Sequence, residues 1–137
     1  MNSTFIDVLN EKYSGQFIIG SNINGYPFIR FPAKNPGFGD VEIYGEMNQD
    51  IHDEKGEEYT VELMKFTHTH IETGAEVIEL IDDILSDNII PVKSWWYGGY
   101  YYRDKYEKKR RRKRLLKKLH VWSGLYTPTI QRSRPGE

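Results

Sequence analysis

Two histidines separated by one residue are the first feature of this sequence that could do chemistry. His68, Thr69 and His70 follow one another in a segment predicted to be a strand. Because side chains i and i+2 of a strand project from the same side, both imidazoles would share one face. Two imidazole nitrogens on one face can bind a divalent metal or serve as a general acid and base. One hypothesis therefore makes His68 and His70 metal ligands of a metal-dependent enzyme.

A metal site would need a third ligand, and the sequence offers three candidates of unequal position. Glu72 lies on the same predicted face, two residues further on, and His120 comes from the last predicted strand. His52 falls near the loop end of a predicted hairpin over 40–66, roughly opposite to the histidine pair. The alternative interpretation is that the two histidines lie on a sheet face and form hydrogen bonds with their neighbours.

The rest of the sequence supplies no catalytic set. The chain has no cysteine, which excludes a disulfide, a thiolate zinc site and a cysteine nucleophile. Glycine-rich phosphate-loop spacing and a nucleophile elbow are both missing. Acid pairs such as Asp82 and Asp83 lie on the exposed side of a predicted helix, where solvent surrounds them. We therefore expect a protein that is not an enzyme and that needs no cofactor.

A run of seven cations divides the chain by charge. Residues 1–102 hold 17 acidic and 6 basic residues, a net charge near −11, and residues 103–137 hold 13 basic and 3 acidic residues, near +10. The whole-chain charge of −1 hides this division. The run consists of Lys108, Lys109, Arg110, Arg111, Arg112, Lys113 and Arg114. Such a division affects which partners approach and from which side.

Three interpretations of the basic run stay open. It could neutralise phosphates of a nucleic acid bound through 103–118, with the neighbouring tyrosines stacking on unpaired bases. It could pair with the acidic helix predicted over 74–87, in the same molecule or in a second copy. It could also be a solvated surface. No apolar residue lies between Tyr106 and Leu115, so two turns of a basic helix over 104–119 would have no side to bury.

Aromatic residues gather just before the basic run. The stretch Trp95–Tyr102 contains two tryptophans, four tyrosines and a Gly-Gly pair, which we interpret as a turn. Strand alternation would bury one tryptophan and expose the other. Trp96 and Tyr100 are therefore candidate partner-binding residues, together with the basic run, since tryptophan and tyrosine dominate binding hot spots. The alternative is that this stretch packs in the core and on the sheet.

The first half of the sequence reads as a helix followed by strands. Asn2 or Ser3 would cap a helix whose apolar side holds Phe5, Leu9 and Tyr13. Asn24-Gly25 predicts a hairpin turn, because both residues tolerate positive φ. The predicted strands are Gln16–Asn22, Tyr26–Phe31, Asp40–Met47 and Glu58–Glu72, the last with a bulge near Met64-Lys65 where the alternation changes phase.

The second half opens with the clearest element. Thr73 and Glu76 match a capping box, and an acidic amphipathic helix follows and is expected to stop at Asn88. Further predicted strands are Ile89–Trp96 and His120–Tyr126, and Tyr100–Arg103 either continues as a strand or begins the basic helix. Short connections between the early strands imply antiparallel pairing.

These elements predict an α+β fold. We expect one two-layer domain over 1–126, with a mainly antiparallel sheet of about 5–6 strands and helices on one face. The basic helix over 104–119 would project or dock, and 127–137 would be a flexible tail. No secretory signal and no apolar segment long enough to span a bilayer is found, so we expect a cytoplasmic protein without a membrane partner.

Residues 40–126 resemble a group of small uncharacterised bacterial α+β proteins, some of immunity-protein type. The segments that carry the resemblance are Phe66–Ile71, before an acidic helix and an aromatic strand, and His120–Tyr126. The seven-cation run is not part of that pattern. The resemblance implies a cytoplasmic, non-enzymatic binding protein, such as an inhibitor of a protein toxin, and transfers no catalytic residue.

Overall fold

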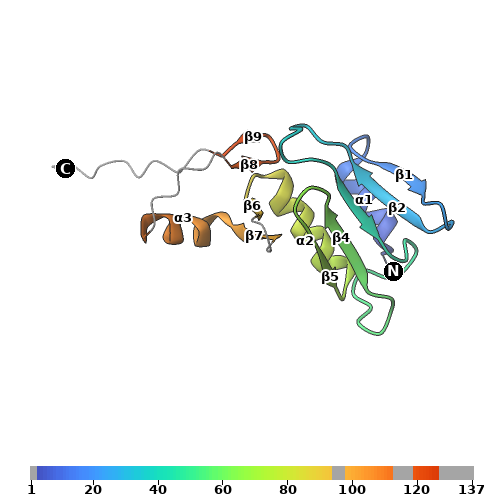
Figure 1. Cartoon of the computed structure of the whole chain (residues 1–137). Helices are drawn as coiled ribbons and strands as arrows, with labels where there is room; N and C mark the ends of the chain where they lie inside the picture. The colour runs from blue at the N-terminus through green and yellow to red at the C-terminus, as the bar shows by residue number, and fades with distance from the viewer. Residues whose placement is uncertain (1–2, 94–97, 113–118, 127–137) are drawn as a thin grey trace.

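The computed structural model describes residues 3–93, 98–112 and 119–126, with the side chains of 109–112 left aside. Short helices and strands follow one another along the chain (Figure 1). Their bounds are α1 Phe5–Tyr13, β1 Ile18–Ser21, β2 Pro27–Phe31, β3 Val41–Tyr44, β4 Tyr59–Leu63, β5 Thr67–Ile71, α2 Gly74–Leu85, β6 Ile89–Lys93, β7 Gly98–Tyr102, α3 Arg103–Arg112, β8 His120–Val121 and β9 Gly124–Leu125.

The first five strands form one antiparallel sheet, in the order β1-β2-β3-β4-β5. Every strand therefore pairs with its neighbour in the sequence. The strands β6 and β7 form a separate two-stranded sheet, and so do β8 and β9. The α+β class is confirmed, and the antiparallel pairing that the short connections predicted is also found.

The segment Glu58–Glu72 is two strands rather than one bulged strand. Tyr59–Leu63 and Thr67–Ile71 pair with each other, with Val61 opposite Thr69. A tight turn at Met64–Phe66 joins them, where the Phe66 N–H donates to the Leu63 carbonyl at 2.8 Å. The phase change in the apolar pattern therefore marks a hairpin, which lacks the usual Gly, Asn or Pro signal.

Two further predictions for the second half were wrong. His120–Tyr126 is a hairpin of two very short strands, β8 and β9, and not one strand. Gly98 and Gly99 are not a turn, because they lie in β7 opposite Lys93 and Val92. A Cβ at Gly98 would collide with the Phe66 carbonyl oxygen, so glycine lets β7 approach the β4–β5 turn closely.

Both early helices begin with a threonine cap. Thr4, and not Asn2 or Ser3, caps α1, because its Oγ1 accepts from the Asp7 N–H at 3.3 Å. Thr73 caps α2 as predicted, accepting from the Glu76 N–H at 3.2 Å while its hydroxyl donates to the Glu76 carboxylate at 3.0 Å. The left-handed residue after α2 is Asp87, with φ of 66°, one position before the predicted stop at Asn88.

The main core lies between the two helices and one face of the sheet. From α1 it includes Phe5, Leu9 and Tyr13, the three predicted residues, and from α2 Val77, Ile78, Leu80, Ile81 and Ile84. The sheet contributes alternate residues of β2, β3 and β4, which we call the inner face: Ile29, Phe31, Val41, Ile43, Tyr59, Val61 and Leu63. Figure 1 shows α2 behind β4 and β5.

The helix α3 extends from the end of β7, away from the five-stranded sheet (Figure 1). Its Tyr106 is buried and packs in a small cluster with Ile90 and Val121. The predicted basic helix ran to residue 119, whereas α3 is described to Arg112 and Leu119 is not helical. Residues 113–118 and the predicted tail 127–137 lie outside the described residues. Among the described helices, none has the length and apolar character to cross a membrane.

Candidate functional site

The side of the sheet opposite the helices carries polar and aromatic residues in two rows. The strand register aligns Arg30, Glu42, Glu62 and His68 in one row and Phe28, Tyr44, Thr60 and His70 in the next. We call these eight residues the outer face. They come from β2, β3, β4 and β5, so the antiparallel order of the sheet is what brings them together.

A buried carboxylate stands at the centre of the outer face. Glu42 is only 4% exposed, although it projects away from the apolar core. Its Oε2 accepts from Arg30 Nε at 2.6 Å, and Arg30 Nη2 lies 2.5 Å from the same oxygen. Its Oε1 accepts from the Tyr44 hydroxyl at 2.7 Å. Both carboxylate oxygens are therefore satisfied, as a buried charge requires.

This network fixes the rings beside it. The Arg30 guanidinium lies 5.0 Å from the centroid of the Phe28 ring, within cation–π range. Phe28 covers Gly20 of β1, where a Cβ would come within 2.8 Å of the ring. Burial, with the hydrogen bond to Glu42, raises the pKa of Tyr44 to about 12. Tyr44 therefore stays a neutral hydrogen-bond donor at physiological pH.

The histidine pair lies on the outer face, as its spacing predicted. The two rings are 5.4 Å apart and nearly perpendicular, at 77°. His70 Nδ1 is 3.1 Å from Thr60 Oγ1 and 3.4 Å from Glu58 Oε1. His68 stands opposite Glu62. Both imidazoles are exposed, and these contacts match the interpretation of surface histidines that bond to their neighbours.

A third metal ligand beside the histidine pair is not found in the described part of the chain. No group of three or more His, Cys, Asp or Glu residues there could hold a metal ion. The candidate His120 packs over Gly37, and its Nδ1 is 3.0 Å from Asn35 Nδ2. Glu72 lies beyond the end of β5, and His52 lies in the β3–β4 loop. The geometry thus gives the metal hypothesis no support among these residues.

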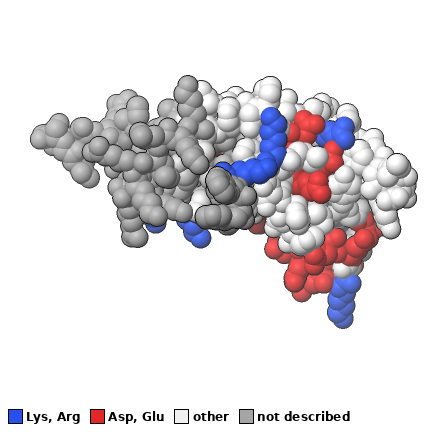
Figure 2. Space-filling model, viewed as in Figure 1, with Lys and Arg blue, Asp and Glu red and all other residues white. Residues whose placement is uncertain are grey.

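An acidic loop borders one end of the outer face. The connection between β3 and β4 carries Glu46, Asp50, Asp53, Glu54, Glu57 and Glu58, which we call the acidic loop. Figure 2 shows acidic side chains gathered there. The loop is fixed by Gln49, whose amide donates to the Glu57 carbonyl at 3.0 Å and accepts from the Glu57 N–H at 2.7 Å. Its negative charges are therefore held in place rather than spread over a loose segment.

A hollow of about 400 Å³ separates the acidic loop from the β1–β2 turn. Tyr26 and Tyr44 provide aromatic rings, and Glu46, Glu57 and Glu58 provide carboxylates. The remaining lining residues are Asn22, Pro27, Gly45 and Thr60. Carboxylates next to aromatic rings form an environment that favours an inserted cation, such as a lysine or arginine side chain.

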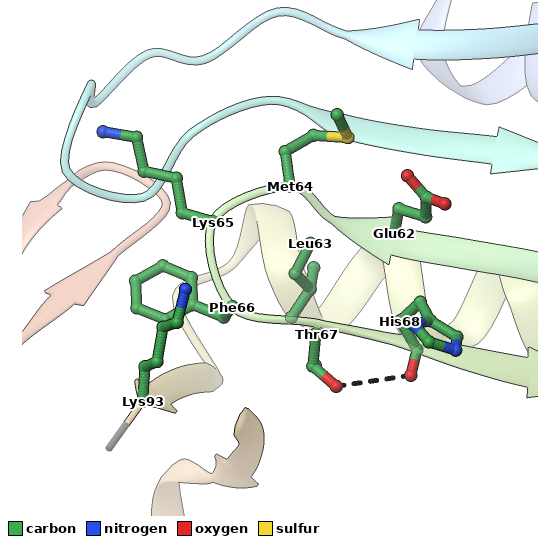
Figure 3. A pocket seen from close by; sticks show the side chains of 8 residues that line it. All are labelled: Glu62, Leu63, Met64, Lys65, Phe66, Thr67, His68 and Lys93. Carbon is green, nitrogen blue, oxygen red and sulfur yellow. Dashed lines mark hydrogen bonds between the residues drawn. The ribbon is translucent and has the colours of Figure 1, made fainter. Parts of the chain in front are cut away.

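A second, smaller hollow of about 270 Å³ lies at the β4–β5 turn (Figure 3). Glu62 and His68 border it from neighbouring strands, and Lys93 reaches it from β6. Lys65, in the turn, donates to the Pro36 carbonyl at 2.5 Å and so ties the turn to the β2–β3 connection. The three turn residues, with Leu63 and Thr67 beside them, supply the rest of the lining, which makes this hollow a notch at the end of the outer face.

Only part of the predicted partner-binding set falls on described residues. Lys108 is exposed on α3, Lys109–Arg112 continue that helix, and Lys113 and Arg114 lie outside the described residues, as does Trp96. Tyr100 is described and is half-buried against the main core. Burial raises the pKa of the Tyr100 hydroxyl, although a hydrogen bond with Thr69 acts in the opposite direction.

In the described contacts, the residues that follow the acidic helix α2 bind Arg103, at the beginning of α3. The Arg103 N–H donates to the Asn88 carbonyl at 2.8 Å, and Arg103 Nε donates to the Asp87 carbonyl at 3.3 Å. On the side of α2 near α1, Asp82 binds Lys12 at 2.7 Å and accepts from the Tyr13 hydroxyl. Pairing between 74–87 and 104–119 stays a prediction.

Sequence reasoning missed the central trio of the outer face. Arg30, Glu42 and Tyr44 come from two strands, and their contact depends on a register that the sequence does not state. The alternation in Asp40–Tyr44 did place Glu42 and Tyr44 on one side, and that was the available signal.

Comparisons with protein-family models, curated proteins and solved structures gave no match to this chain.

Proposed function

We propose that this is a cytoplasmic, non-enzymatic binding protein that captures a basic protein partner through its acidic loop and outer face. The observation that carries the proposal is the acidic loop held by Gln49 beside a hollow lined by Tyr26 and Tyr44. In the more specific form that the resemblance suggests, the partner is a toxin whose basic functional surface is covered, as an immunity protein would do.

Charge and rigidity support this choice of partner. Six carboxylates in one loop would speed the approach of a basic surface, and association would then depend on ionic strength. The hollow offers a place for one cationic side chain, which would contact both rings and at least one carboxylate. Because Gln49 and Glu42 already hold the surrounding groups, little ordering entropy would be lost on binding.

The arrangement of layers agrees with the proposal. With α1 and α2 packed against the inner face, a two-layer domain leaves the outer face to a partner. The groups that surround the buried Glu42 on that face are mixed: two exposed imidazoles and the half-buried side chains of Glu62 and Thr60. Such a surface is polar at its rim and rigid at its centre, as binding surfaces often are.

Affinity capture from the source cells tests the proposal. The chain is immobilised, captured proteins are identified, and the affinity of each purified partner is measured at low and at moderate salt. The variant Glu57→Gln with Glu58→Gln should weaken binding of the partner at least ten-fold. The control variant, Glu11→Gln with Glu79→Gln, removes the same amount of charge from exposed helix positions. It should change the affinity for the partner less than two-fold. Equal effects of both double variants, or the absence of any captured basic protein, would reject the proposal.

A nucleic-acid-binding module is the second candidate, favoured by one observation. Lys105 and Lys108 are exposed on α3, which extends away from the sheet (Figure 1). Binding through 103–118 should weaken steeply as salt rises, because counterions are released from the phosphates. Fluorescence anisotropy with short DNA and RNA probes measures this. Unchanged binding after Arg110→Ala, Arg111→Ala and Arg112→Ala together would eliminate the candidate.

A further inference from the structure

The two edge strands of the five-stranded sheet, β5 and β1, differ in what lies beside them. At the β5 edge, β7 approaches closely, with Gly98 against the Phe66 carbonyl. At the other edge, β1 pairs with β2, and no further strand pairs with it among the described residues. Figure 1 shows β1 at the outer side of the sheet, far from the β6–β7 hairpin.

The open edge of β1 presents unpaired backbone groups. The Asn22 N–H donates to the Tyr26 carbonyl at 2.9 Å, so these two residues form a hydrogen-bonded pair at the turn. In an antiparallel ladder such pairs alternate, which makes Gly20 with Phe28 and Ile18 with Arg30 the next bonded pairs. The N–H and carbonyl groups of Ile19 and Ser21 therefore point away from β2, toward the open edge.

No side chain of β1 is charged, and two of its four residues are exposed isoleucines. Ile18 is 51% exposed and Ile19 is 58% exposed. The segment Gln16–Asn22 contains no lysine, no acidic residue and no proline. Strands that stay at the edge of a monomer usually carry such residues, or a bulge, to prevent pairing with another chain. The composition of β1 is that of a strand that pairs on both sides.

We infer that β1 pairs in antiparallel orientation with β1 of a second copy of this chain. With Ile19 opposite its own counterpart across a twofold axis, the outward groups of both copies bond to each other. Ile18 of one copy then stands opposite Gly20 of the other, next to the Phe28 ring that covers this glycine. The result is a continuous ten-stranded sheet.

The composition of β1 favours a second copy of this chain, rather than a different protein, as the partner at this edge. An uncharged strand has nothing with which to select the basic protein of the proposed function, whereas its exposed Ile18 and Ile19 would bury apolar surface against the same strand of a second copy. The hollow beside the acidic loop is lined by Asn22 and Tyr26 of the β1–β2 turn, but by no residue of β1 itself. The dimer is therefore independent of the proposed function.

Sedimentation equilibrium of the full chain across a wide concentration range tests the inference. The wild-type chain should give a dimer that dissociates on dilution, and added salt should leave the dissociation constant within about two-fold. Ile19→Lys should raise that constant at least ten-fold. Ile23→Lys is the matched control, because Ile23 is 99% exposed in the turn beyond β1, and it should behave as wild type. Thermal unfolding of both variants establishes that they fold.

A single engineered cysteine reports the pairing directly, since the chain has none of its own. In the proposed register the Cα atoms of residue 19 in the two copies lie about 5.5 Å apart, a distance that a disulfide spans. Ile19→Cys should therefore cross-link under mild oxidation at least ten-fold faster than Ile23→Cys. A monomeric wild-type chain, equal cross-linking of both variants, or a dimer that salt dissociates would each overturn the inference, the last by favouring pairing of the acidic and basic helices.

Discussion

The two faces of the five-stranded sheet are held by different forces. On β3, Val41 and Ile43 project into the apolar core, while Glu42 and Tyr44 project to the outer face and join Arg30. Both sets are at least partly buried. The inner face depends on volume and close packing, whereas the outer face depends on directed polar contacts that must all be present together. Adjacent residues of one short strand should therefore respond differently to substitution.

The largest loss of stability is expected on the inner face. Ile43 is fully buried, so Ile43→Ala removes apolar contacts and leaves a cavity. The free energy of unfolding should fall by about 2–5 kcal/mol. Chemical denaturation measures it, with Ile23→Ala as the exposed control, which should stay within about 0.5 kcal/mol of wild type. Similar losses for the two variants would mean that Ile43 does not pack as described.

On the outer face the loss of stability should be intermediate. It should also depend on whether the oppositely charged residue of the Arg30–Glu42 pair is replaced at the same time. Glu42→Gln keeps the size of the side chain but removes the charge that faces Arg30, and should lower the free energy of unfolding by about 1–3 kcal/mol. Replacing Arg30 and Glu42 together by Met should cost less than the sum of the two single replacements, because neither charge is left alone. Additive losses in this double-mutant cycle would show that the two residues act independently.

Alkaline pH should lower the free energy of unfolding, because each face of the sheet contains one tyrosine with a raised pKa. Burial raises the pKa of Tyr59 on the inner face and of Tyr44 on the outer face to about 12, from 10.0. Folding therefore favours the neutral phenol: this contribution is complete below pH 10 and is lost as pH rises through 12. For the fully buried Tyr59 the loss near pH 11 is about 1 kcal/mol.

Denaturation midpoints between neutral and alkaline pH measure this loss, and tyrosinate absorbance follows the ionisation itself. Tyr59→Phe and Tyr44→Phe remove one titrating phenol each and should make the decline shallower. An unchanged decline in both variants would place the responsible groups elsewhere.

The smallest effect should come from the exposed part of the outer face. His70 contacts Glu58 and Thr60 at the surface, where solvent screens charge. His70→Ala should therefore change the free energy of unfolding by no more than about 0.5 kcal/mol. Both variants are measured in the same denaturation series. If His70→Ala lowered the free energy of unfolding as much as Glu42→Gln does, the rim of the outer face would matter as much for stability as its centre.

Local signals in the sequence predicted much of the fold. Thr73 and Glu76 marked the start of α2, and Asn24-Gly25 marked the β1–β2 turn, because these residues act on their own backbone neighbourhood. The turn at Met64–Phe66 carries no such residue, and its shift in alternation was equally compatible with a bulge. The Gly98-Gly99 pair predicted a turn where there is a strand, because the missing side chain of Gly98 allows a close contact with the distant β4–β5 turn.

The outer face was harder to predict than the fold. The spacing of His68 and His70 correctly placed both on one side of a strand, because that relation is local. The burial of Glu42 depends on Arg30, twelve residues away in sequence, and on a strand register that is set by the whole hairpin. A single sequence shows the polar residue but not the charge that compensates it.

The order of the sheet has a consequence for how fast the chain folds. Each of the five strands pairs with the next one in the sequence, so no ladder joins distant segments, and the longest connection is the acidic loop over 45–58. Topologies with such local pairings fold faster than those that join distant segments. The approach of β7 to the β4–β5 turn spans α2 and β6, so this contact should close later than the ladders of the sheet. We therefore expect the meander to be native-like in the folding transition state, with the β6–β7 hairpin docking afterwards.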